Sequence, residues 1–281
     1  MEQAIDTEFL LNSRRNAFVE CSMHFMEHNN VVAYFGENIP LAVLFGYGLV
    51  AVPLEDIDTE IFQFTSAELR NGGFCDCITS TLTYLETDKC PILFSAKAYL
   101  FSNACERLFT EFSARTEKPC IRFNATSFQT AQREAELKSA LRDIADTDFD
   151  EAAYKKAYND LVYIDSVLEK IAAYSDATAL ELFLLRFYSP YITNLTERVR
   201  YFETLEKTIR FKTERRERPL FTAACPRGAF KSIAAQVPEN ALIMWQCPHE
   251  VAALERFDFA DAACTFQHVH ECRYERGLYN K

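Results

Sequence analysis

Residues 31–56 read VVAYFGENIPLAVLFGYGLVAVPLED, and this stretch decides the fold class. Its first five residues are β-branched, aromatic or apolar, which is typical of a buried strand, and residues 49–54 repeat this composition. Between them, residues 36–38 carry a turn signal, and Pro40 suits the first turn of a helix, where its missing N–H does no harm. The stretch therefore predicts a strand, a helix to about Gly48 and a second strand, which are normally parallel with a right-handed connection.

The alternation of strands and helices continues on both sides of this unit. Residues 7–29 place apolar side chains at helical spacing and predict a first helix. Residues 75–86 predict a helix that leads into a third strand at residues 91–95, PILFS. A further helix begins near Cys105, and residues 119–123 favour a fourth strand. The N-terminal part is thus predicted to be an open parallel sheet.

The rest of the chain falls into two parts. From residue 130 the composition changes to Ala, Glu, Lys and Leu with persistent helical stripes. We therefore predict a helical insert at residues 128–217, between an N-terminal α/β domain at residues 1–127 and a short C-terminal α/β domain at residues 218–281. The expected fold class is α/β, with two Rossmann-like parallel-sheet domains and an intervening helical segment. The C-terminal domain is expected to have strands at residues 220–225, 241–247 and 262–270 and helices at residues 229–237 and 249–257.

Charge and hydropathy argue against two classes of partner. The formal net charge is −11 and the pI is about 5.1, whereas binding to phosphate backbones requires clustered Lys and Arg. The basic run at residues 212–218, KTERRER, is interrupted by two glutamates and indicates a solvated helix end or linker rather than a phosphate site. The longest apolar stretch, residues 39–54, is shorter than the roughly 20 residues of a membrane helix. Because the N-terminus shows no cleavable signal pattern, we expect a cytoplasmic protein that binds neither nucleic acid nor a membrane.

Common cofactor and hydrolase motifs do not occur, but the sequence contains ten cysteines. Neither GxGxxG, GxxxxGK[ST], GxSxG nor HExxH is found. The reducing cytosol disfavours disulfides, so an excess of cysteine there indicates either buried apolar side chains or metal ligands.

Four of the cysteines lie at predicted helix starts or strand ends. Cys75, Cys77 and Cys105 come at or just before helices, and Cys272 follows the last predicted strand. Such positions converge at one edge of a parallel sheet, where helix N-termini help to ionise thiols. The C-x-C spacing of the first pair is not that of a zinc finger or a ferredoxin, so spacing alone leaves both a metal site and core cysteines open. The other six are predicted to be core side chains, namely Cys21, Cys90, Cys120, Cys225, Cys247 and Cys264.

Three segments, taken in order, resemble the 2-hydroxyacyl-CoA dehydratase and benzoyl-CoA reductase family. Residues 31–56 resemble its strand, turn, Pro-led helix and Gly-containing entry to a second strand. Residues 101–112, FSNACERLFTEF, resemble its Cys-acid-x-Leu helix start. Residues 264–277, CTFQHVHECRYERG, resemble its strand that ends just before a cysteine. Together with the general layout, the resemblance covers most of the chain.

The resemblance implies a heterodimer of two homologous subunits, each with two α/β domains and three cysteines that hold a 4Fe-4S cluster with one open iron site. The ligands in this sequence would be Cys75 or Cys77, then Cys105 and Cys272. In that family an ATP-dependent activator iron–sulfur protein supplies one electron, and the acyl-CoA substrate loses water through a ketyl radical. The resemblance thus implies a lyase subunit. Two alternatives stay open: a cluster-free partner or assembly subunit of the same fold, and a cluster reductase that does not use CoA.

Acidic and histidine side chains near the same edge are further candidates. Glu37 and Glu55 follow the first two predicted strands, and a carboxylate there can move a proton during dehydration if its pKa is raised. A solvated loop acid is the competing interpretation. His268 and His270 alternate along the last predicted strand, where they either line the site or pack at the strand edge.

Overall fold

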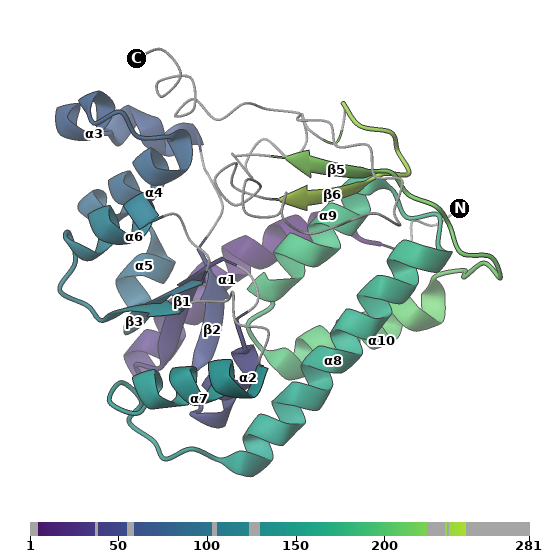
Figure 1. The fold of residues 1–281 in the computed structure, drawn as a ribbon, viewed down its shortest axis with the longest axis horizontal. Coiled ribbons are helices and arrows are strands. Elements are labelled where there is room, and N and C mark those ends of the chain that lie inside the picture. Colours follow the sequence, from purple (N-terminus) through teal and green to yellow (C-terminus); the bar gives the residue numbers. More distant parts are fainter. Residues whose placement is uncertain are drawn as a thin grey trace.

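The computed structural model of the protein describes residues 5–36, 39–54, 59–102, 106–123, 130–223, 234 and 236–245. Its main feature is a four-stranded parallel sheet with helices around it (Figure 1). The spatial order of the strands is β2-β1-β3-β4, and every neighbouring pair is parallel. The expected α/β class is therefore confirmed. The strands are β1 (Val31–Phe35), β2 (Val50–Pro53), β3 (Ala98–Ser102) and β4 (Cys120–Phe123).

The predicted strand, helix and strand unit is also confirmed. β1 and β2 are parallel neighbours with Val31 opposite Val50, and α2 (Leu41–Gly46) connects them. Every residue of β1 is buried, which fits its continuous apolar composition. The amide of Leu54 donates to the carbonyl oxygen of Tyr34 over 2.9 Å, so the pairing continues just past the carboxyl end of β2.

The third strand begins later than the sequence pattern predicted. Pro91–Ser95 form the short helix α5, and β3 follows it in the chain. Pro91 lies in the first turn of α5, where its fixed φ and missing N–H favour a helix start. A five-residue apolar run has no readable period, so its composition does not separate a buried strand from a buried helix. The Tyr99 hydroxyl donates to the carbonyl oxygen of Leu93 over 2.7 Å and thereby ties β3 to α5.

Helices cover both faces of this sheet. On one face, Val32, Tyr34 and Leu100 pack with α2 and with α7 (Thr130–Leu141). On the other face, Phe35 and neighbouring strand residues pack with α1 (Thr7–Glu27), α5 and α6 (Glu106–Ser113). Strand side chains alternate between faces, so one short strand serves both layers. The connection from β2 to α5 runs through η1 (Thr59–Phe64), α3 (Ala67–Asn71) and α4 (Asp76–Thr87).

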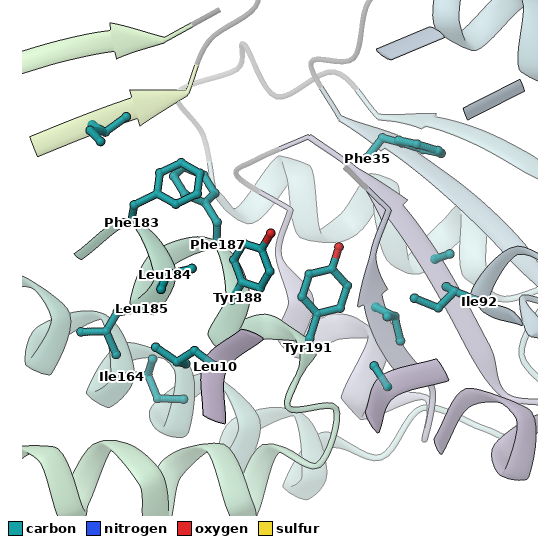
Figure 2. Close-up of a cluster of buried hydrophobic side chains, with 14 of the residues drawn as sticks. Leu10, Phe35, Ile92, Ile164, Phe183, Leu184, Leu185, Phe187, Tyr188 and Tyr191 are labelled. Atoms are coloured by element: carbon teal, nitrogen blue, oxygen red, sulfur yellow. The ribbon is translucent and has the colours of Figure 1, made fainter. Parts of the chain in front are cut away.

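Helices follow one another through residues 130–208, within the predicted helical segment, and pack directly against the sheet unit. α8 (Glu151–Tyr174) contacts α2, and α9 (Ala179–Tyr188) contacts α1 (Figure 1). Figure 2 shows Ile164 of α8, Phe183 and Phe187 of α9 and Leu10 of α1 in one apolar cluster. Thus one core joins the predicted N-terminal domain to the helical segment, while the predicted domain boundaries remain a prediction. The helices that follow α7 are α8 (Glu151–Tyr174), α9 (Ala179–Tyr188), η2 (Ser189–Tyr191) and α10 (Leu195–Thr208).

A second parallel strand pair follows the helical segment. β5 (Leu220–Ala223) and β6 (Leu242–Trp245) are hydrogen-bonded neighbours, as the alternation after Pro219 predicted. Most of the predicted helix at residues 229–237 lies outside the described residues, as do the later helix and strand. No described helix combines the length and apolar character that crossing a membrane requires.

Candidate functional site

A ligand-binding site is expected at the carboxyl edge of the four-stranded sheet. The chain leaves β1 to form β2 on one side and later returns to form β3 on the other, so the strand order reverses between β1 and β3. Open parallel sheets bind ligands outside such a reversal. At this point Gly36 has a φ of +92°, and a Cβ on it would lie 1.5 Å from the carbonyl oxygen of Ser102. Only glycine allows the ends of β1 and β3 to approach this closely.

Two of the predicted ligand cysteines lie at the start of α4. Cys75 is the N-cap residue, with φ −71° and ψ 163°, and Cys77 lies in the first turn. Both side chains are half-buried. Exposed N–H groups and the helix dipole favour negative charge at this end, and therefore favour the thiolate form of a cysteine.

The loop before α4 is fastened to the first turn of α6 by Arg107. Its guanidinium group donates to the carbonyl oxygens of Gly72 and Gly73 over 2.8 and 3.3 Å. The same group lies over the ring of Phe74, 4.4 Å from the ring centroid. A cation in the first turn of a helix opposes the helix dipole, so its presence needs a compensating contact. The loop supplies that contact through Gly72, Gly73 and Phe74, the residues that precede Cys75 in the chain.

Arg107 was not among the predicted site residues. The sequence did contain an indication of its role. Arg107 lies two positions after Cys105, in the first turn of a predicted helix, where acidic residues are usually favoured.

The predicted site residues divide into two groups. Cys75 and Cys77 are described and come together at the N-terminus of α4. The described ranges contain no group of three or more His, Cys, Asp and Glu side chains arranged to hold a metal ion. The thiols of α4 suit a thiophilic metal by donor type, but two thiols alone do not complete a ligand set. Glu37, Glu55, Cys105, Cys272, His268 and His270 lie outside the described residues.

The cysteines predicted to be core side chains behave accordingly where they are described. Cys21 and Cys90 are buried in the main core, and Cys120 packs against it. Burial raises the pKa of the Cys21 thiol to about 12 and that of Cys120 to about 11, and it also raises the pKa of Cys90. Thiols held in the neutral form are poor ligands and poor nucleophiles. The other three, Cys225, Cys247 and Cys264, lie outside the described residues.

Arg198 is a second residue of interest that was not among the predicted site residues. It lies on the buried stripe of α10 with Leu195, Phe202 and Leu205, and only 5% of its surface is exposed. Burial lowers the pKa of its guanidinium group, and the nearby Tyr34 and Asp165 act in the opposite direction. The helical spacing of this stripe was readable in the sequence, where an arginine interrupts three apolar residues.

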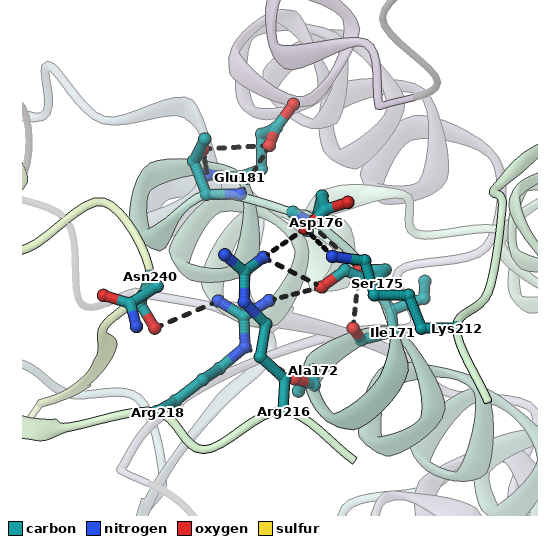
Figure 3. A network of polar contacts seen from close by, with 11 residues as sticks. Ile171, Ala172, Ser175, Asp176, Glu181, Lys212, Arg216, Arg218 and Asn240 are labelled. Atoms are coloured by element: carbon teal, nitrogen blue, oxygen red, sulfur yellow. Dashed lines mark hydrogen bonds and ion pairs between the residues drawn. The ribbon is translucent and has the colours of Figure 1, made fainter. Parts of the chain in front are cut away.

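The basic run at residues 212–218 forms a linker, as predicted. Figure 3 shows Arg218 donating to the carbonyl oxygens of Ala172 and Ser175, near the C-terminus of α8, and of Asn240. Asp176 accepts hydrogen bonds from Lys212 and Arg216. The cations of this linker therefore cap a helix C-terminus and pair with an acid.

One hollow lies beside the linker at residues 212–218 and a small cavity lies beside the end of β2. A shallow hollow of about 410 Å³ beside the linker is lined by Asp176, Arg216, Glu239 and Asn240, whose mixed charges favour neither anions nor cations. A cavity of about 20 Å³ beside the end of β2 has room for about one water molecule.

Comparison with known proteins adds no evidence about the family or function of this chain. No model of a known protein family matches the chain, and no curated protein matches it significantly. The family resemblance therefore rests on the three quoted segments alone.

Proposed function

We propose that this chain is the iron–sulfur subunit of a 2-hydroxyacyl-CoA dehydratase-like enzyme and thus part of a lyase. Supporting this is the contact of Arg107 with Gly72 and Gly73. The proposal requires the starts of α4 and α6 to lie near each other, and Arg107 in the first turn of α6 contacts the loop that precedes α4. The proposed ligands are Cys75 or Cys77, with Cys105 and Cys272, for a 4Fe-4S cluster.

Under the proposal, Cys75, Cys77 and Arg107 each have a role in holding the cluster. Cys75 and Cys77 would bind iron at the N-terminus of α4, where the helix dipole favours negative charge. Arg107 adds a positive charge and keeps the Gly72-Gly73 loop in place. When bound, a cluster of this kind supplies one-electron transfer and an iron that acts as a Lewis acid. We propose Glu37 and Glu55 as the residues that move protons, since both follow strands whose carboxyl ends face this edge.

The wider assembly follows from the same proposal. Residues 218–281 would form a second Rossmann-like domain that begins with β5 and β6, completing the two-domain architecture. The partners would be a homologous subunit, an ATP-dependent activator and an acyl-CoA substrate. A reducing compartment such as the cytoplasm suits thiolate ligands.

The decisive experiment measures iron and acid-labile sulfide in anaerobically purified protein, alone and with any copurifying subunit, followed by an electron paramagnetic resonance spectrum after reduction. The expected result is about four of each per chain. Cys105→Ala and Cys272→Ala should lose most of the iron, while Cys21→Ala, which changes a core thiol, should keep it. Absence of iron under both conditions would favour a cluster-free partner subunit. Iron binding without any binding of acyl-CoA would favour a CoA-independent reductase.

A further inference from the structure

Arg198 is a buried cation that the described chain does not neutralise. Its Nε atom is buried and has no hydrogen-bond partner. Among the described residues, no carboxylate oxygen lies within 4.0 Å of its guanidinium nitrogens. Arginine does not lose its proton in proteins, so the group must keep its charge in the core. A buried charge without a partner is strongly unfavourable and calls for an explanation.

The nearest described acid is a weak counterion. Asp165 of α8 interacts with Arg198 at longer range than an ion pair. The side chain of Asp165 is exposed to solvent. Partial desolvation by neighbouring atoms nevertheless raises the pKa of Asp165, and the positive charge of Arg198 lowers it by a smaller amount. Solvent screens such a contact. Asp165 is therefore not an ion-pair partner of Arg198.

The position of Arg198 in the fold matches a ligand site. η2 contacts β2, and α10 begins at Leu195, shortly after η2, and packs on α8. Tyr34, which is close enough to Arg198 to affect its pKa, is the next-to-last residue of β1. The guanidinium group thus lies toward the carboxyl edge, where parallel sheets of this kind bind ligands.

We infer that Arg198 is an anchor for a bound oxyanion, meaning the carboxylate or phosphate group of a small-molecule ligand that reaches the carboxyl edge of the sheet between α8, α10 and β1. A guanidinium group binds either oxyanion with two parallel N–H···O bonds, and burial strengthens such bonds. The inference does not depend on an iron–sulfur cluster, because an oxyanion can bind Arg198 whether or not the chain holds iron.

The test is thermal unfolding of the full chain in sodium chloride, inorganic phosphate or sodium acetate at one fixed ionic strength. For the wild-type protein we expect the Tm to rise saturably with phosphate if the natural group is a phosphate, or with acetate if it is a carboxylate. Arg198→Met keeps an unbranched chain as far as the position of Nε and removes the charge. It should unfold in chloride at a Tm equal to or above that of the wild type, because an unpaired buried charge has gone. It should also show no response to either anion.

Two further variants distinguish anion binding at Arg198 from a general effect of removing an arginine. Arg15→Met changes an exposed arginine of α1 and should respond to the anions like the wild type. Arg198→Lys keeps the charge but loses the planar fork, and should bind the effective anion about tenfold more weakly. A Tm of Arg198→Met several degrees below that of the wild type in chloride, with an unchanged anion response, would show that the protein itself pairs Arg198. A wild-type protein that responds to neither anion, or an Arg198→Lys variant that binds as well as the wild type, would likewise overturn the inference.

Discussion

The guanidinium carbon of Arg107 lies 4.4 Å from the ring centroid of Phe74, so a cation of α6 stacks on the loop that leads into α4. The same guanidinium group donates to two backbone carbonyl oxygens of that loop. These contacts join two helix starts that are far apart in the sequence. They hold the three residues that immediately precede Cys75.

Arg107→Lys should loosen this loop although the charge is kept. Lysine cannot bind two carbonyl oxygens in a fixed fork or stack flat on a ring, so we expect a loss of about 1 kcal/mol in the free energy of unfolding. Urea unfolding followed by circular dichroism measures this. Arg15→Lys on the exposed face of α1 is the matched control and should change the midpoint little. Equal effects of the two variants would show that the Arg107 contacts contribute nothing measurable.

Gly36→Ala should be far more damaging than Gly48→Ala. Both glycines have positive φ, but the new Cβ at Gly36 would overlap the Ser102 carbonyl oxygen, whereas at Gly48 the nearest atom is Thr147 Oγ1 at 3.9 Å. Left-handed strain alone costs about 1–2 kcal/mol, which is the expected loss for Gly48→Ala. For Gly36→Ala we expect more than about 3 kcal/mol, because a strand end must move as well.

The two glycine variants are compared by chemical denaturation under the same conditions. Similar losses at both positions would mean that β1 and β3 separate easily at their carboxyl ends. The close approach that defines the candidate edge would then be of little consequence for stability.

The local sequence pattern predicted some strands correctly, and the one wrong strand prediction has a physical cause. Residues 31–35 form a strand as predicted, because a β-branched and aromatic run between two turn signals leaves few alternatives. Residues 91–95 were wrongly predicted as a strand, because the next apolar run, at residues 98–102, has the same composition. Only the pairing of β3 with its two neighbours decides between the runs, and that information is non-local.

The candidate site was predictable to a smaller degree. The position of Cys75 and Cys77 at a helix start followed from a loop signal at Gly72-Gly73 and the helical pattern after it. The role of Arg107 depends on a contact with residues more than 30 positions away in the sequence. Arg198 similarly gains its significance from α8 and β1, which no reading of α10 alone reveals.

Acid should weaken the linker contact of Asp176. The hydrogen bond from Lys212 and the charges of Arg216 and Arg218 lower the pKa of Asp176 in the folded protein. A carboxyl group whose pKa is lower in the folded state contributes stability above its unfolded value of about 4, and loses that contribution as the pH falls through the folded value. Asp176→Asn should therefore lower the urea midpoint modestly at pH 6, and the difference from the wild type should shrink below about pH 4.

The control for this prediction is Asp143→Asn, since Asp143 is exposed and has no ion pair in the described part of the chain. It should show the same midpoint as the wild type at both pH values. A gap between the wild type and Asp176→Asn that stays constant down to pH 3 would contradict the proposed role of the carboxylate.

Thiol alkylation should separate the helix-start cysteines from the core cysteines. Iodoacetamide reacts with the thiolate, and burial raises the pKa of Cys21 from 9.0 to about 12, which reduces its thiolate fraction about a thousandfold. Cys75 and Cys77 are only half-buried at the start of α4, so the reagent reaches them more easily than the fully buried Cys21. In reduced, chelator-treated native protein at pH 8, we therefore expect peptide mass spectrometry to show labelling of Cys75 or Cys77 at least about tenfold faster than that of Cys21. In urea the rates should converge, because unfolding removes both effects. If native Cys21 reacted as fast as Cys75, the assignment of Cys21 to the core and of the α4 thiols to a reactive edge would both fail.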